Sequence, residues 1–271
     1  MTRRPSRPAR VLATALATGT LLATAVACSD GSGSPEAAAV SPAAERSPAP
    51  SRTPALTGPG AQAALITPAD IEDDWQLAND AATWRNQMLV GKVDVAEFLN
   101  AKSDAADCQR LLDSLYSDTL LGRATGASGL RGFTSQDSRL LYQVGDYGQA
   151  GMDATIKWLK NLPTECNQFS ATGSDGSKRT VQVVEYKDPP KAGDALAALT
   201  VTVQGTSNGQ PATTTLDVVA FRVGASGAAV TNGGLSGVDH DSTALAVQNG
   251  AKRLKDVLSG KTPAPLPSQF D

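Results

Sequence analysis

The sequence is poor in the residues that most catalytic and metal sites require. It has one histidine and three cysteines among 271 residues, and only 4% of its residues are aromatic. Zinc is bound mainly by histidine and cysteine, and histidine is the commonest general base, so neither a zinc enzyme nor a histidine-dependent catalyst is expected. No P-loop is present, and no G-x-G-x-x-G follows a predicted strand. No G-x-S-x-G hydrolase motif occurs either. We therefore expect no cofactor, no metal and no catalytic residue.

An excess of positive charge is also missing. The chain has 24 basic against 27 acidic residues, which gives a formal charge of −3. A nucleic-acid-binding domain usually carries a basic face, so a nucleic-acid partner is not expected. At 271 residues the chain is long enough for one or two domains with a real hydrophobic core.

The N-terminal segment 1–27 has the pattern of a secretory signal. An uncharged run of about 17 residues follows four arginines, Arg3, Arg4, Arg7 and Arg10. This run is shorter than a membrane span, which needs about 20 apolar residues. The run ends in TAVAC, which resembles a bacterial lipobox except that Ala25 replaces the usual Leu. We predict that a diacylglycerol is attached to Cys28. The alternative is an ordinary signal peptide followed by an unpaired cysteine.

Acylation at Cys28 supplies the two or more chains that stable membrane anchoring requires. Loss of the signal also leaves 20 basic against 27 acidic residues. Because an anionic bilayer repels such a body, contact with the membrane is expected through the lipid and not through head groups. The predicted location is the outer face of the cytoplasmic membrane.

Residues 28–60 are nearly all Ser, Gly, Pro and Ala, with no aromatic residue. Such a segment buries too little apolar surface to offset its ordering entropy, so it is predicted to be a disordered tether. Glycosylation of its Ser and Thr residues stays open. The tail 262–271 contains three prolines and is also expected to be loose.

Residues 61–261 have the regular patterning of one folded domain without internal repeats. Apolar spacing predicts helices over 104–116, 148–162 and 242–258, with Pro163 ending the second, and Thr67–Pro68 begins a shorter one. Alternating or β-branched runs predict the strands 88–93, 130–135, 139–147, 168–172, 179–186, 198–204, 213–223 and 228–231. Short Gly- and Asn-containing turns join several of them, which favours antiparallel pairing. The predicted class is α+β, an antiparallel sheet flanked by helices.

The two remaining cysteines lie 58 residues apart in this domain. In an exported protein, an even pair of cysteines favours a disulfide, and we predict Cys108–Cys166. The alternative is two buried free thiols. No C-x-x-C spacing supports a redox role.

The order of these features resembles the PknH-like extracellular sensor domains of actinobacteria. The resemblance rests on ALITPADI before Trp75, a helical Cys108, LYQVGDY, the NLPTEC segment ending at Cys166, and the D-V-V-x-x-R-x-G segment at Asp217–Gly224. It implies an antiparallel sheet flanked by helices, with a cleft for an extracellular ligand. The family's kinase member carries two disulfides, whereas this chain can form one. Since no kinase domain is present here, the resemblance implies that a signal passes through a partner.

Three residues are candidates for contacting a ligand. Strand alternation places Gln182 and Tyr186 on one face of their strand, and Arg222 opposite Val219 and Phe221 on another. If helices cover only one face of the sheet, these three residues line a groove on the other, where Arg222 suits an anionic group. The alternative is ordinary cross-strand pairing on a solvated sheet face.

His240 lies between two aspartates in VDHDS and could act as a base or a metal ligand. No further ligands lie nearby in the sequence, so we interpret the segment as a polar loop in which Asp241 or Ser242 caps the last helix.

Three functions are compatible with these observations. The first is a lipid-anchored extracytoplasmic ligand-binding or sensor-type domain without catalytic activity, whose ligand is a small molecule or an envelope component. The second is a module that docks on an envelope protein through an exposed apolar patch. The third is a glycan-processing hydrolase that uses paired carboxylates.

Overall fold

The computed structural model describes residues 55–72 and 74–264. Its centre is an eight-stranded antiparallel sheet, and the predicted α+β class is confirmed. From one edge to the other the strands are β1 (Gln76–Ala78), β4 (Ser128–Ser135), β5 (Ser138–Asp146), β10 (Ser226–Gly234), β9 (Gln210–Val223), β8 (Ala195–Ser207), β7 (Lys178–Glu185) and β6 (Gln168–Thr172). A separate two-stranded hairpin consists of β2 (Leu89–Val90) and β3 (Val93–Asp94).

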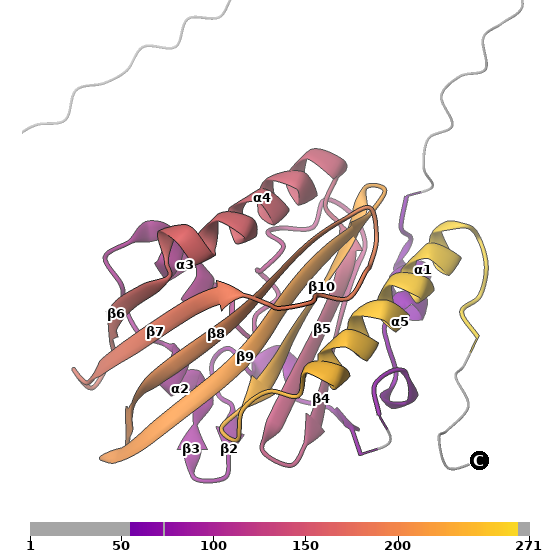
Figure 1. The fold of residues 1–271 in the computed structure, drawn as a ribbon. Helices are drawn as coiled ribbons and strands as arrows, with labels where there is room; N and C mark the ends of the chain where they lie inside the picture. The colour runs from indigo at the N-terminus through magenta and orange to yellow at the C-terminus, as the bar shows by residue number, and fades with distance from the viewer. Residues whose placement is uncertain (1–54, 73, 265–271) are drawn as a thin grey trace, which may run out of the picture. The chain divides into compact units, whose positions relative to one another are not determined.

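Helices cover both faces of this sheet (Figure 1). One core cluster packs α2 (Val95–Leu99), α3 (Ala106–Ser114) and α4 (Gln149–Glu165) against the first face. A second cluster packs α1 (Gly58–Ala64) and α5 (His240–Leu258) against the opposite face. The 3₁₀ turns η1 (Pro68–Asp70) and η2 (Ala81–Thr83) complete the connections. Within the described ranges, no helix has the length and apolarity needed to cross a membrane.

The two-residue turn between β8 and β9 explains why these strands form the central hairpin of the sheet. The 13 residues of β8 and the 14 of β9 are joined by Asn208 and Gly209, which both have positive φ, 51° and 73°. Two successive residues with positive φ form the two-residue turn whose twist matches that of paired strands, and Asn-Gly is the sequence that best tolerates it. This turn fixes the register of the long strands that carry the site.

The burial pattern shows where α5 stops covering the sheet. On β9, Val218 packs toward α4 and Val219 toward α5, and both are fully buried. On β7 the pattern alternates from Lys178 to Val184, with Val181 and Val183 buried under α4 and Gln182 exposed on the other side. Figure 1 shows β7 and β8 without a helix on the side where α5 lies. One end of the sheet is therefore open on its α5 side.

The two ends of the described chain meet on this side of the sheet. Ala61 and Leu65, in and just after α1, share a core cluster with Val247 and Leu254 of α5. Arg253 Nε donates to the carbonyl oxygen of Leu65 at 3.1 Å. The domain is closed by the contact between its first and last helices.

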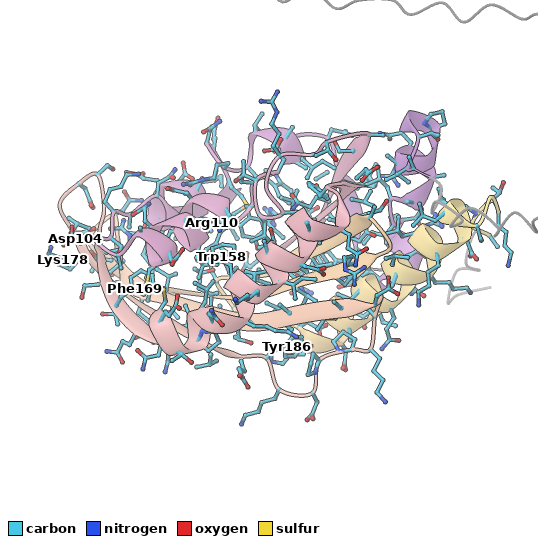
Figure 2. The ribbon with its side chains drawn as sticks, turned by 90° about the horizontal axis from the view of Figure 1, so that it is seen from above. Asp104, Arg110, Trp158, Phe169, Lys178 and Tyr186 are labelled. Carbon is cyan, nitrogen blue, oxygen red and sulfur yellow. A yellow bond between two sulfur atoms is a disulfide. The ribbon has the colours of Figure 1, made fainter. Side chains whose placement is uncertain are left out.

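The predicted disulfide is confirmed. Cys108 lies in α3 and Cys166 follows α4, and their sulfur atoms are joined with a Cα–Cα distance of 5.6 Å. The three tryptophans, Trp75, Trp84 and Trp158, are buried. The guanidinium carbon of Arg110 on α3 lies 3.7 Å from the centroid of the Trp158 ring. Figure 2 labels both side chains.

Several predicted boundaries were wrong. Pro163 does not end the helix predicted over 148–162, because α4 continues to Glu165 and the Cys166 N–H donates to the Leu162 carbonyl at 2.7 Å. The strand predicted over 88–93 is the β2–β3 hairpin, since Gly91 has a φ of 59° and turns the chain. The elements β1, α1 and α2 were not predicted.

The N-terminal predictions fall mostly outside the described residues. The signal at 1–27, Cys28 and the tether as far as residue 54 belong to this part, as does most of the tail 262–271. Leu56 is buried in the α1–α5 core cluster, and α1 spans the boundary predicted at residue 60. The packed domain thus includes Leu56, which lies within the predicted tether.

Candidate functional site

The three residues predicted to share a groove do not lie together. Gln182 and Tyr186 are on the α5 side of the sheet, because β7 pairs with β8 in a register that aligns Gln182 with Thr202. Arg222 pairs with Gly227 of β10, and a side chain added at Gly227 would meet Met152 of α4. Arg222 is therefore on the α4 side. The prediction of one groove was wrong because it assumed that helices cover only one face of the sheet. Arg222 points away from Phe221, toward the face that α4 covers, whereas the open region lies on the α5 side.

Arg222 links two parts of the domain. Its Nε lies 2.9 Å from Asp153 Oδ1 on α4, and its NH1 lies 3.5 Å from Asp194 Oδ2 before β8. The same NH1 donates to the Gly224 carbonyl at 2.8 Å. These contacts fix α4 to the β9–β10 turn, and the guanidinium is engaged within the protein.

Tyr186 instead belongs to a cluster centred on the only histidine of the chain. The Tyr186 hydroxyl donates to the His240 carbonyl at 3.0 Å. The two rings are stacked, with centroids 5.0 Å apart and an angle of 29° between their planes. His240 was interpreted as part of a polar loop, but it is the first residue of α5, and Asp239 is the cap, accepting from the N–H groups of Asp241 and Ser242.

A buried carboxylate holds the imidazole in place. Asp217 has no exposed surface, and its Oδ2 lies 2.7 Å from His240 Nδ1. Thr200 donates to Oδ1 and Thr243 to Oδ2, each at 3.0 Å. Burial raises the pKa of Asp217, and the bonds from His240, Thr200 and Thr243 partly offset that rise. The carboxylate is thus a fixed acceptor for the imidazole.

This contact also determines the chemistry of the exposed ring edge. An ionised carboxylate can only accept hydrogen bonds, so a neutral His240 carries its proton on Nδ1 and leaves Nε2 as an acceptor. The His240 side chain is 54% exposed. The pair therefore presents a hydrogen-bond acceptor and proton acceptor to solvent in one orientation. The same device orients metal-binding and catalytic histidines in other proteins.

A depression of about 490 Å³ lies against these rings. It is lined by Val184, Glu185, Tyr186, Lys187, Asp188, Thr200, His240, Asp241 and Ala244. Burial, and then the negative charges of Asp217, Asp241 and Asp239, raise the pKa of Tyr186 to about 12. Tyr186 is a neutral phenol at physiological pH, and its buried ring lies behind the more exposed ring of His240. Across the described residues no group of three metal-binding side chains occurs.

A larger hollow of about 790 Å³ lies near the opposite edge of the sheet, beside Ser128, Gln143 and Tyr147. Gln143 can satisfy its amide with the Ser117 carbonyl and the Leu121 N–H. No oriented titratable pair like Asp217–His240 is recorded among its described residues. We place the candidate site at Tyr186 and His240 for that reason.

No family model matches the sequence, and no curated protein matches it. Among solved structures, the fold is similar to that of the extracellular domain of PknH from Mycobacterium tuberculosis, with a TM-score of 0.47. The two chains are 11% identical over an alignment that covers 77% of this chain and all of that domain.

Proposed function

We propose that the protein is an exported, lipid-anchored domain that binds a ligand in the depression beside Tyr186 and His240, as a sensor-type domain without catalytic activity. One observation carries the proposal. A fully buried carboxylate, Asp217, is used to fix an imidazole that is half exposed at the open end of the sheet. Burying a carboxylate costs free energy, and its bond to His240 serves to orient an exposed group.

The contacts around His240 support binding more than hydrolysis. A hydrolase with a Ser-His-Asp arrangement needs a nucleophilic hydroxyl that donates to the exposed imidazole nitrogen. Thr200 is the one hydroxyl-bearing aliphatic residue among those that line the depression, and it donates to Asp217. Tyr186 is buried behind the His240 ring, and its hydroxyl donates to the His240 carbonyl. The arrangement provides one exposed, flat imidazole ring with an oriented acceptor.

The predicted leader, the lipobox-like TAVAC at Cys28 and the Cys108–Cys166 disulfide support a location outside the cytoplasm. The interaction-module alternative required a contiguous exposed apolar patch. The large apolar side chains exposed among the described residues are Leu77, Leu89 and Val184, which belong to β1, β2 and β7. Because β1 and β7 lie near opposite edges of the sheet, these side chains form no single patch.

The single histidine makes a direct test practical. We would express the exported chain with Cys28→Ser and without a polyhistidine tag, label its histidine with ¹⁵N and ¹³C, and record the one imidazole signal. Compounds from cell-envelope extracts that raise Tm would be added in turn. We expect such a ligand to shift the His240 signal and to bind His240→Ala at least tenfold more weakly. Gln87→Ala, an exposed change away from the depression, is the matched control and should bind normally.

The proposal fails if every compound that raises Tm leaves the imidazole signal unchanged and binds His240→Ala as tightly as the parent chain.

A further inference from the structure

The open end of the sheet extends the site beyond the depression, and its chemistry points to a class of ligand. We propose that this surface binds a neutral oligosaccharide, with one sugar ring against Tyr186 and His240 and the rest of the chain along the strands. This inference rests on the function proposed above and specifies its ligand. The open face is defined by eight side chains: Gln168, Ser170, Thr180, Gln182, Thr202, Gln204, Thr213 and Thr215.

Strand register arranges these side chains in two rows across four strands. Gln168, Gln182, Thr202 and Thr215 form one row, and Ser170, Thr180, Gln204 and Thr213 form the next. Directly paired residues point to the same face of a sheet. The rows are continuous with the depression, because Val184 pairs with Thr200, and Thr200 with Asp217, in the row that follows Gln182.

None of the eight side chains is buried, and none makes a hydrogen bond to another described side chain or backbone group. Helix α5, which packs on β9 and β10 on this face, begins only at His240, beside Asp217. Each amide and hydroxyl of the open face is therefore free to donate and accept hydrogen bonds. Figure 1 shows the strands of this region uncovered on that side.

The open face carries no charged residue. Lys178 borders one end, where its Nζ donates to Thr172 Oγ1. The depression at the other end has three carboxylates, Glu185, Asp188 and Asp241, beside one cation, Lys187. An anionic polymer, a nucleic acid or an acidic lipid would find no cation on these rows. A protein partner would find no apolar centre, because Val184 is the one large exposed apolar residue next to them.

A sugar chain matches what the surface does offer. Sugar hydroxyls donate and accept hydrogen bonds, as glutamine amides and threonine hydroxyls do. The apolar face of a sugar ring fits the exposed His240 ring, which Tyr186 supports from behind, and the oriented Nε2 of His240 accepts from a hydroxyl. From Tyr186 to Thr180 the strand runs for about 20 Å, at about 3.3 Å per residue. That length suits an oligosaccharide of several units better than a single sugar.

The test uses the exported chain with Cys28→Ser and ¹⁵N,¹³C-labelled histidine. Maltohexaose, cellohexaose, xylohexaose and an array of neutral glycans are the probes, and hexagalacturonate is the anionic control. We expect at least one neutral glycan to shift the His240 signal and to bind Gln182→Ala/Thr202→Ala about tenfold more weakly. Both substituted residues are solvent-accessible, and Gln87→Ala again provides a matched control that should retain full affinity.

Two results would overturn the oligosaccharide inference and leave the proposed function standing. One is a His240 signal that responds to an envelope compound but to no neutral glycan. The other is glycan binding that neither shifts His240 nor weakens in the double variant, while an envelope compound does shift His240. If the imidazole signal responds to no compound or glycan at all, the proposed function fails together with the inference.

Discussion

Asp217 Oδ2 lies 2.7 Å from His240 Nδ1, although the carboxylate is completely buried and the imidazole is half exposed. The two residues are 23 positions apart, one on a central strand and the other at the start of the last helix. Their contact joins the interior of the sheet to the surface of the proposed site. A single substitution at Asp217 would therefore remove the contact that orients the exposed His240 ring.

Asp217→Ala should both destabilise the domain and release the ring. The hydroxyls of Thr200 and Thr243 and the Nδ1–H of His240 lose their acceptor, so we expect a loss of about 2 kcal/mol in the free energy of unfolding. Urea unfolding measures the loss, and the ¹⁵N shifts of His240 report whether Nδ1 keeps the proton of the neutral ring. Asp104→Ala, an exposed carboxylate change (Figure 2), should alter neither quantity. Unchanged nitrogen shifts in Asp217→Ala would contradict the assigned tautomer.

The tyrosines predict how stability depends on alkaline pH. Burial raises the pKa of all four, Tyr116, Tyr142, Tyr147 and Tyr186, the last two to about 12. A group whose pKa is raised in the folded state stabilises the fold below its unfolded pKa of about 10, and this contribution is lost as pH rises toward the folded value. The free energy of unfolding should therefore fall steeply above pH 10. Phenolate absorbance should be nearly absent at pH 10 in the native chain and half-developed in denaturant. Phenolate signal from the native chain at pH 10 would contradict these shifts.

The disulfide should contribute substantially to stability. Because it closes a loop of 58 residues, the chain-entropy estimate is about 4 kcal/mol. Cys108→Ala/Cys166→Ala is expected to lower the midpoint of urea unfolding to about the value of the reduced parent chain. Equal midpoints with and without reductant would show that the bridge adds nothing.

Arg222→Ala should affect stability without affecting the site. The substitution breaks ion pairs with Asp153 and Asp194, whose side chains are each 49% exposed, so a loss of about 1 kcal/mol is expected. The His240 signal and ligand affinity should stay as in the parent, because Arg222 lies on the opposite face of the sheet. Loss of ligand binding in a folded Arg222→Ala chain would instead support the role first predicted for this residue.

Lipid attachment at Cys28 is tested separately. We expect the parent chain, and not Cys28→Ser, to incorporate a palmitate analogue in cells and to sediment with membranes. Equal labelling of the two chains would rule out the predicted anchor. Cys108→Ala/Cys166→Ala serves as the control for labelling at other cysteines and should incorporate the analogue normally.

Local patterns in the sequence were sufficient for most of the fold. The apolar stripe of α5 predicted its C-terminal end at Leu258, and Asn208–Gly209 is one of the short turns from which antiparallel pairing was predicted. The elements that were missed are short: β1 has three residues and α2 has five. Such segments have too few residues for a periodic pattern, and they form because the rest of the domain packs against them.

The site was harder to predict because it depends on pairing between distant segments. His240 was noticed as a histidine between aspartates, yet its partner is neither Asp239 nor Asp241 but Asp217 on β9. Asp217 lies within a run of apolar strand residues. Since an aspartate is rarely buried without a partner, its presence in that run was the one sign in the sequence of a buried polar contact. Arg222 was misplaced for a related reason, since alternation assigns two faces to a strand but does not say which face stays open.

The contact between α1 and α5 has a consequence for the export proposed above. A polypeptide that crosses a membrane from its amino terminus delivers α5 last, and until then Val219 and Phe221 of β9 lack the helix that covers them. During such transport α1 would be the one described helix available to that face of the sheet. The native structure would then form only after nearly the whole domain has arrived, and the chain would stay unfolded during translocation.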